Sequence, residues 1–422
     1  MPDAHASADP RLLAGRDYRL IFAAAQLTTL AAAISGLALP LTAVTHLGAS
    51  SMEMALLAAA ELLPFALFSL PAGAWIDRSR KKWIGIAFNL LAAAASMIVP
   101  LVFTLGTLSL NFLYGLGFVI GGCAVIGGSA VQVHLTQVVG RDRLLEATAQ
   151  MTAANSGISI VGPAFAALLM AHFDTPLTVT ASALLFAGGA LVLWRIRRDD
   201  PPPAHPRAHW WPDALDGLRL IRTTPMLRAL ALFGALWLML LGGFGAQFVL
   251  FTTRDLGLSA TDLALISSFG AAGALAGSIA ARRFERRRGA RSVMLAGFLL
   301  SAIGMGLYPL ATSMGQTPLA HGTLMFAACV KLFTDFAITL YTVNYISLRH
   351  RITPDAMLGR VTTSMRGIGV SAAPVGALAW GVVAERAGIA PAMLLISAAG
   401  ILLWLAARRY MPQPRAFDVQ ST

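Results

Sequence analysis

Long apolar runs alternate with short polar segments along the whole chain. Twelve of these runs are long enough to cross the roughly 30 Å hydrocarbon core of a bilayer as helices of about 20 residues. Helices are expected because a segment in lipid must hydrogen-bond its backbone groups within itself. The predicted spans are residues 20–45, 53–75, 83–105, 108–136, 147–172, 176–196, 226–250, 259–281, 291–312, 319–347, 359–384 and 390–408.

The composition supports this class of protein. Hydrophobic residues make up 57% of the 422 residues, charged residues make up 12%, and the mean hydropathy is +0.69. A soluble chain of this length is not normally so apolar. The first 19 residues carry three aspartates and no apolar run, so we expect no secretory signal. Cys123 and Cys329 fall inside predicted spans, so we expect no disulfide, metal site or cofactor.

The net charge of +12 suggests nucleic-acid binding at first sight, but the distribution of the cations argues against it. When the first loop is placed outside, nearly all Lys and Arg residues fall in the loops on the other side. This positive-inside bias predicts a multi-pass membrane protein with both termini in the cytoplasm. We expect contact with anionic lipid headgroups and no nucleic-acid partner. The basic groups lie at 11–19, 78–82, 141–143, 195–228, 282–291, 349–360 and 408–415.

The chain repeats itself weakly at half its length. Residues 46–56 (HLGASSMEMAL) parallel residues 255–265 (DLGLSATDLAL), 209 positions later. We therefore predict two pseudo-symmetric six-helix bundles, residues 1–197 and 226–422, with the substrate bound between them near mid-membrane. The polar, Pro-rich segment 198–225 is predicted to be a cytoplasmic linker that contains an amphipathic interfacial helix.

Four stretches of the sequence resemble the major facilitator superfamily of transporters. They are the charged hairpin GAWIDRSRKK at residues 73–82, RLLEA at 143–147, Gly162-Pro163, and LGRV at 358–361 followed by Arg366 and Pro374. More narrowly, the chain is similar to the bacterial branch of enterobactin-exporter-like and macrolide-efflux-like proteins. The resemblance implies an all-α integral membrane fold of twelve helices in two bundles, which rock around a central site and are usually driven by the proton gradient.

The charged hairpin carries the gate that this resemblance implies. Asp77 is placed to face the N-terminus of the eleventh span, where the helix dipole and Arg360 both favour an anion. We predict that Gly73, Asp77, Arg78 and Arg360 form a cytoplasmic gate. The alternative is a solvated loop that follows the positive-inside rule. The hairpin departs from the family in carrying Arg80 where a glycine is usual.

Two other family motifs are imperfect in this chain. In the second half, the position that matches the acid of the hairpin falls on Ala281 or Glu285. In the fifth span, the resemblance implies that Gly157, Gly162 and Pro163 form a helix-packing motif, because small residues allow close approach of neighbouring helices. The glycine pair that usually follows this proline is replaced by alanines, which weakens the motif as a sign of transport direction.

Charged side chains inside the spans are the main candidates for chemistry. Glu61 lies in the second span, Lys331 and Asp335 lie four residues apart on the tenth, and Arg366 lies in the eleventh. A carboxyl at this depth must be protonated, paired or in water, and a group that changes between these states suits proton coupling. We predict that these four residues serve proton coupling or the substrate cavity.

Each of these residues also has a structural interpretation. Glu61 is alternatively a hydrogen-bonded structural acid, Lys331 and Asp335 an internal charge pair, and Arg366 a side chain that snorkels to the headgroups. Spans two and eleven face each other in this family, so a direct Glu61–Arg366 pair is a further alternative. Uncharged polar residues in the spans either line the cavity or bond helices together; they are Gln26, Asn111, Gln132, Asn155, Gln247, Tyr341 and Asn344.

The sequence contains no motif of the common enzyme classes that we considered. It has no nucleotide-binding P-loop, zinc-protease or serine-hydrolase motif, and its loops are too short for a catalytic domain, so we predict that it is not an enzyme. We predict a monomeric transporter that exports drugs or siderophore-like metabolites by proton antiport, with small molecules, protons and the bilayer as partners. The alternatives are import, flipping of a lipid-like substrate, or a receptor or scaffold that no longer transports.

Overall fold

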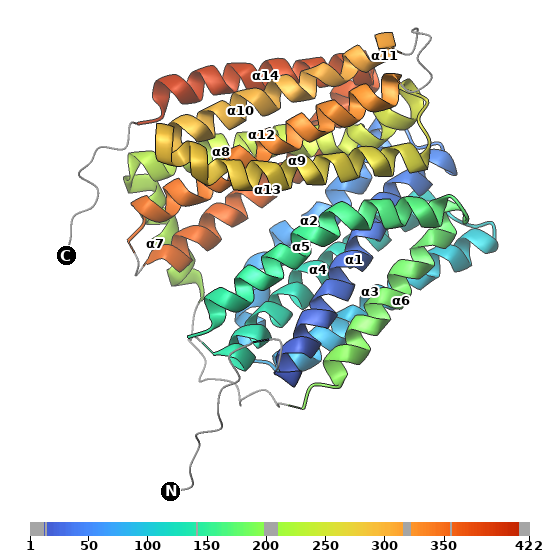
Figure 1. The fold of residues 1–422 in the computed structure, drawn as a ribbon, viewed down its shortest axis with the longest axis horizontal. Helices are drawn as coiled ribbons and strands as arrows, with labels where there is room; N and C mark the ends of the chain where they lie inside the picture. The colour runs from blue at the N-terminus through green and yellow to red at the C-terminus, as the bar shows by residue number, and fades with distance from the viewer. Residues whose placement is uncertain are drawn as a thin grey trace, which may run out of the picture.

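The computed structural model describes Leu12 and residues 15–140, 142–197, 210–314, 322–354 and 357–412, and these residues form helices and short connections without strands (Figure 1). Twelve helices are long and apolar enough to cross a membrane, which confirms the predicted all-α membrane fold. The first bundle contains α1 (Arg16–Thr45), α2 (Ser51–Asp77), α3 (Lys81–Thr104), α4 (Leu110–Val139), α5 (Leu144–Met170) and α6 (Thr175–Trp194).

The second half begins with α7 (Trp210–Thr223), a short helix within the segment where the sequence predicts an amphipathic one. The second bundle follows it. It contains α8 (Pro225–Leu250), continued by the π-turn η2 (Phe251–Asp255), α9 (Ala260–Arg288), α10 (Ala290–Leu307), the turn η3 (Tyr308–Leu310), α11 (Ala311–Met314), α12 (Gly322–Ile352), α13 (Leu358–Ala387) and α14 (Ile389–Tyr410).

The internal repeat is visible as two matching helix starts. Before α2, the Ser50 side chain accepts a hydrogen bond from the Glu53 backbone N–H, and the Glu53 carboxylate accepts one from the Ser50 N–H. Ser259 and Asp262 form the same capping box before α9, 209 residues later. Gly48 and Gly257 precede the two boxes, each with φ of +64°, a conformation that strongly favours glycine.

The repeat also resolves where the second copy of the charged hairpin lies. The starts of α2 and α9 are 209 residues apart, and the starts of α3 and α10, at Lys81 and Ala290, are separated by the same offset. This offset therefore places Arg286, the neighbour of Glu285, at the position of Asp77. Glu285 instead accepts hydrogen bonds from Ser347 and Arg351 of its own bundle.

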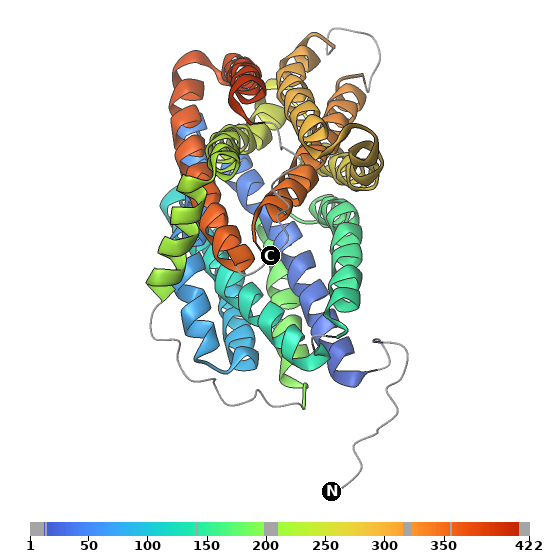
Figure 2. The ribbon, with the colours of Figure 1, turned by 90° about the vertical axis from the view of Figure 1, so that its left-hand side faces the viewer.

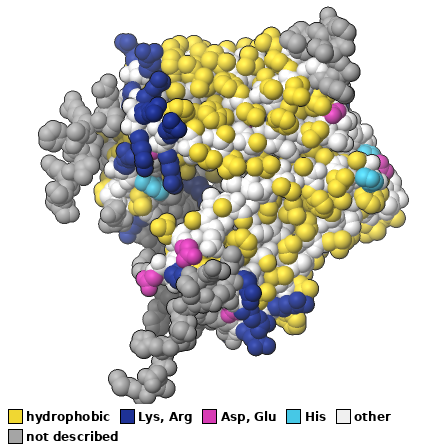
Figure 3. Space-filling view, in the orientation of Figure 1, with side chains coloured by type: hydrophobic (Ala, Val, Ile, Leu, Met, Phe, Trp, Pro, Cys, Tyr) yellow, Lys and Arg dark blue, Asp and Glu magenta, His cyan; other side chains and the backbone are white. Residues whose placement is uncertain are grey.

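The two bundles have a common polarity. Basic side chains gather where α2, α4, α9 and α12 end, and we call this side the basic end. The opposite side, which carries Gly48, Gly257 and the two capping boxes, is the far end. Figure 3 shows Lys and Arg side chains collected toward one end of each bundle, with apolar side chains covering most of the remaining visible surface.

The bundles pack together mainly in their far halves. Helix α2 packs along α13, and α5 packs along α9. The far half of α1 and residues 166–170 of α5 share a hydrophobic cluster with α8 and α9. Between α2, α8 and α13, the small residues Ala55, Ala246 and Ala377 are buried against one another, with Ala58 beside them. In Figure 1 the two bundles converge toward one side and splay apart toward the other.

At the basic end, α7 lies against the start of α13, as Figure 2 also shows. The Arg360 guanidinium donates to the Asp216 carboxylate at 3.1 Å. Gly217 lies so close to the Arg360 carbonyl and the Ser364 hydroxyl that a Cβ at this position would come within 2.7 Å of both. The linker helix is therefore attached to the second bundle at the place where the sequence predicts the gate.

Candidate functional site

The Glu61 carboxyl lies where α2 crosses α4, about 15 Å from the far end of α2. The crossing is close because α4 presents glycines: a Cβ at Gly117 would come within 3.0 Å of the Glu61 Cγ, and one at Gly121 would collide with the Glu61 carbonyl oxygen. Within the described residues, no cation or hydrogen-bond donor contacts the Glu61 carboxyl. Its side chain is partly exposed. The first bundle therefore holds an unpaired carboxyl at mid-span.

The second bundle holds a neutralised pair at its corresponding crossing. The Lys331 ammonium donates to both carboxylate oxygens of Asp335, at 2.9 and 2.7 Å, and each side chain is 19% exposed. The same ammonium lies 5.2 Å from the centre of the Phe248 ring. On α9, Gly270 leaves room for the pair, because a Cβ there would collide with the Asp335 carboxylate and lie 2.8 Å from the Lys331 Cγ. The two charges compensate each other within α12.

The two crossings are related by the internal repeat with their roles exchanged. The 209-residue offset of α2 and α9 matches Glu61 with Gly270. The starts of α5 and α13, Leu144 and Leu358, are 214 residues apart. Applied to α4 and α12, this offset matches Gly117 and Gly121 with Lys331 and Asp335. In one half α2 carries the charge and α4 the glycines; in the other half α9 carries the glycine and α12 the charges.

Glu61 and Arg366 do not form the direct pair that was considered from the sequence. Arg366 is exposed on α13 and has no ion-pair partner among the described residues. The Glu61 side chain is directed at the glycines of α4 within its own bundle. The α2–α13 interface instead brings other groups together, nearer to the far end.

Three side chains of the second bundle hold the backbone of the first bundle at the far end. The Gln247 amide donates to the Ser51 carbonyl at 3.1 Å, Arg254 donates to the Gly48 carbonyl at 2.7 Å, and Glu385 accepts from the Met52 N–H at 3.1 Å. We call these three side chains and the backbone of residues 48–52 the far-end clamp. Glu385 also places a negative charge at the N-terminus of α2, where the helix dipole favours it.

The residues of the predicted gate lie at the basic end. Gly73 is exposed, and a Cβ there would meet nothing within 4 Å. Arg78 is exposed and caps the end of α2. Asp77 is the last residue of α2, and its side chain lies outside the described part of the structure. Arg360 bonds to Asp216 of the linker helix. The gating role of these residues stays a prediction.

The motif of the fifth span shows one close contact. A Cβ on Gly162 would lie 2.9 Å from the Ala33 Cβ of α1, so the two helices approach closely there. A Cβ on Gly157 would meet nothing within 4 Å, so that glycine takes no part in close packing in this structure. Pro163 lies inside α5 without ending the helix.

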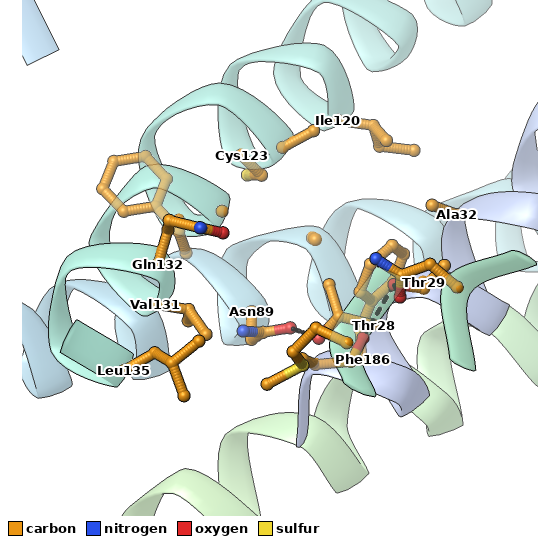
Figure 4. A pocket seen from close by; sticks show the side chains of 18 residues that line it. Thr28, Thr29, Ala32, Asn89, Ile120, Cys123, Val131, Gln132, Leu135 and Phe186 are labelled. Carbon is orange, nitrogen blue, oxygen red and sulfur yellow. Dashed lines mark hydrogen bonds between the residues drawn. The ribbon is translucent and has the colours of Figure 1, made fainter. Parts of the chain in front are cut away.

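A cavity of about 350 Å³ lies within the first bundle (Figure 4). Helices α1, α3, α4, α5 and α6 contribute to its wall, and among the described residues every lining side chain is uncharged. The wall combines aromatic and aliphatic side chains with Thr, Asn and Gln. The lining residues are Ala25, Thr28, Thr29, Ala32, Phe88, Asn89, Ala92, Ile120, Cys123, Ala124, Gly127, Gly128, Val131, Gln132, Leu135, Met151, Asn155 and Phe186.

The structure separates the uncharged polar residues that the sequence singled out. Gln132 and Asn155 line the cavity, and Gln247 belongs to the far-end clamp. Asn344 is buried and donates to the Leu340 carbonyl of its own helix. Sequence reasoning missed Asn89, which lies in an apolar run. It also missed the clamp residues Arg254 and Glu385, which look like ordinary charges at helix ends.

Comparison with known proteins places these features in context. The family model described as Major Facilitator Superfamily matches residues 21–330. An uncharacterized MFS-type transporter of Sinorhizobium fredii is 27% identical over 332 residues, covering 77% of this chain and 78% of that protein. The enterobactin exporter EntS of Shigella boydii is 26% identical over 318 residues, 72% of each chain. The multidrug efflux pump Tap of Mycolicibacterium fortuitum is 25% identical over 403 residues, 92% and 94% of the two chains.

Solved structures share the fold at lower sequence identity. The nucleoside transporter NupG has a TM-score of 0.72 at 14% identity, covering 94% of this chain and 98% of its own. A bacterial homologue of the iron transporter ferroportin has a TM-score of 0.72 in its inward-facing state, at 15% identity and with 94% and 99% of the chains covered. In its outward-facing state the TM-score is 0.59, at 16% identity and with 93% and 99% covered. The family model and the curated relatives agree with a transporter rather than an enzyme.

The far-end clamp generates the first testable prediction. Combining Gln247→Leu with Glu385→Ala removes two of the three polar contacts across the far end, so we expect the two bundles to separate there more often. Ala58 lies beside the buried alanines between α2, α8 and α13. In a protein with Cys123 and Cys329 replaced by serine, Ala58→Cys reports this opening through its rate of maleimide labelling in detergent. We expect the rate to rise about three- to tenfold.

Arg386→Gln is the matched control for the clamp. Arg386 is exposed, adjoins Glu385 and has no bonding partner among the described residues. Its replacement should leave the labelling rate unchanged. An equal rate in the clamp variant and this control would contradict a role of the clamp in closing the far end.

The Lys331–Asp335 pair generates the second prediction. Lys331→Met or Asp335→Asn alone leaves the other charge without its partner inside the span, and each should destabilise the protein by about 2 kcal/mol. The double variant removes both charges and should regain most of that loss. Thermal unfolding of the purified proteins measures the three values. If the double variant loses at least as much stability as the two single variants lose together, the two charges do not compensate each other.

Proposed function

Because the chain belongs to the major facilitator superfamily, we propose that it is a secondary transporter that exports small amphipathic molecules in exchange for protons. The named relatives EntS and Tap are an exporter and an efflux pump, which supports export over import. The basic end is assigned to the cytoplasm by the positive-inside rule, with both termini there and the protein in a bacterial inner membrane. We expect the protein to work as a monomer without a cofactor.

In this assignment the structure represents a state open toward the cytoplasm. The bundles are joined at the far end by small residues and by three hydrogen bonds to backbone groups. The alanines between α2, α8 and α13 can separate without extracting large side chains, whereas the cluster that α1 and α5 share with α8 and α9 has to release larger ones. The higher TM-score with the inward-facing than with the outward-facing ferroportin homologue supports the same state.

The single observation that carries proton coupling is the unpaired carboxyl of Glu61. An ionised carboxylate without a partner inside the span is costly, whereas a protonated one is not. Asp335 already has a compensating cation at hydrogen-bonding distance, so it gains little from taking up a proton. We therefore assign the exchanging proton to Glu61 and a structural role to the Lys331–Asp335 pair. Proton uptake would occur when the far end is open, and release would occur toward the cytoplasm.

Glu61→Gln is expected to abolish substrate-dependent dissipation of an imposed pH gradient, because an amide cannot carry the proton. The measurement uses purified protein in proteoliposomes, a pH-sensitive dye inside them, and a panel of amphipathic drugs and siderophores. The Lys331→Met and Asp335→Asn double variant should retain coupling. Glu53→Gln is the control, since glutamine also serves in a capping box. Coupling that survives in Glu61→Gln and disappears in the double variant would move the assignment to Asp335.

Asp77→Asn separates a transporter from a scaffold. The change keeps the size of the side chain and removes the negative charge that a helix N-terminus and Arg360 would attract. We expect substrate flux to fall while membrane insertion and thermal stability stay unchanged. Arg80→Gln, in the same hairpin, is the matched control. Full substrate flux in Asp77→Asn would contradict the gating role. If Asp77→Asn lacks flux but its function in the cell is unaltered, the receptor or scaffold is favoured.

A further inference from the structure

The cavity within the first bundle lies to one side of the interface between the bundles. Its wall reaches Phe88 and Asn89 on α3 and Phe186 on α6, and no described residue of the second bundle lines it. Gln132 lies seven residues before the end of α4, and Met151 lies seven residues after the start of α5, so both are about 10 Å from the basic end. The cavity therefore lies in the half of the bundle that is nearer to the basic end.

The wall selects against charge. All of the described lining residues are uncharged, and the ionisable residues Glu61, Lys331 and Asp335 lie outside the wall. A charged group buried here would lose its hydration without meeting an opposite charge, which is strongly unfavourable. A volume of about 350 Å³ lies at the lower end of the range for ligand pockets. The cavity thus suits an uncharged group of one or two rings.

The composition of the wall favours an aromatic, and therefore planar, group. Six lining residues are alanine or glycine, whose small size leaves room beside Phe88 and Phe186. The Met151 thioether adds a polarisable contact of the kind that aromatic rings make with sulfur. Aromatic rings also gain from edge or offset contacts with phenylalanine.

Two polar side chains of the wall have hydrogen-bonding capacity to spare. Asn89 is already held by Thr28 and by the Gly85 carbonyl, both at 2.8 Å. The Gln132 amide makes no hydrogen bond within the described residues, and Figure 4 shows it projecting from α4 toward the cavity. Asn155 meets only the Thr29 hydroxyl, at 3.4 Å. These two amides offer donors and acceptors to a ligand.

We propose that this cavity binds the uncharged, planar aromatic part of the cargo, with Gln132 and Asn155 bonding to an amide or hydroxyl group on the ring. Its role as a cargo site rests on the proposed transport function. The binding itself is independent of transport and is tested on purified protein. Cys123 lines the cavity and is a free thiol, so it reports occupancy directly.

The experiment measures modification of Cys123 by methyl methanethiosulfonate in a Cys329→Ser background in detergent. The probes are 2-naphthamide, 2-naphthoate and 2-naphthamidine, which share one ring system and differ in charge. We expect 2-naphthamide to slow modification in a saturable way and the two charged probes to leave the rate unchanged. Equal protection by all three, protection by a charged probe alone, or a thiol that the reagent cannot reach in the free protein would overturn the proposal.

Gly128→Leu and Gly115→Leu form a matched pair of filling variants on α4. A Cβ at either position meets nothing within 4 Å, so neither change collides with a neighbour at that atom, but only Gly128 lines the cavity. Gly128→Leu should abolish binding of 2-naphthamide, and Gly115→Leu should not. Because the new side chain also stands near Cys123, equilibrium dialysis with radiolabelled 2-naphthamide gives the affinity without the thiol. Equal affinity in the two variants would place the probe elsewhere.

Gln132→Leu tests the hydrogen bond. This change keeps a side chain of similar size and should weaken the binding of 2-naphthamide about three- to tenfold, which is the range of one neutral hydrogen bond. Unsubstituted naphthalene should bind the variant and the parent protein equally. If its affinity for the variant falls as much as that of 2-naphthamide, Gln132 makes no specific hydrogen bond to the ligand. Binding without flux in proteoliposomes would reject the transport function and keep the site, whereas flux without binding would do the reverse.

Discussion

The cost of a charge inside lipid is the constraint on which the rest of this structure depends. The two halves of the chain meet it in opposite ways at matching helix crossings. The second bundle places Lys331 beside Asp335, so the pair is neutral in any conformation that keeps α12 intact. The first bundle places Glu61 alone against glycines. A duplicated scaffold is therefore asymmetric at matching positions inside the spans, where a change of protonation has a large energetic effect.

The interface between the bundles combines polar contacts to backbone groups with contacts between small residues. Its polar contacts run from side chains of one bundle to backbone groups of the other. Its apolar contacts combine the alanines between α2, α8 and α13 with the larger side chains that α1 and α5 share with α8 and α9. The Met52 N–H at the start of α2 is free to donate to Glu385 because helix termini leave their first N–H groups without partners inside the helix. Small residues permit close approach without interlocking. The alanine contacts between α2, α8 and α13 can therefore open without repacking large side chains, while the cluster at α1 and α5 stabilises the closed far end.

Hydropathy and charge were sufficient to predict the twelve spans, because length in lipid and loop charge are properties of local sequence. The repeat was equally local, because residues 46–56 and 255–265 match in sequence, and the structure adds that these segments hold the two capping boxes. The match of Gly117 and Gly121 with Lys331 and Asp335 was not predictable, since it needs a second offset that depends on where α5 and α13 begin. The clamp was also missed, because Arg254 and Glu385 at helix ends look like solvated charges. The cavity arises from small side chains on five helices, and no single segment carries a signal for it.

Helix α4 connects the two parts of the first bundle that carry the proposed chemistry. Gly117 and Gly121 contact Glu61 on α2, while Ile120, Cys123 and Ala124 on the neighbouring face line the cavity. Gly121 packs directly against the backbone of α2, and as a glycine it has no side chain that could adjust if α4 shifted. Close-packed helices transmit such a shift rather than absorb it. A ligand that displaces α4 from the cavity side must therefore alter the surroundings of the Glu61 carboxyl, which gives cargo binding a direct route to the proton site.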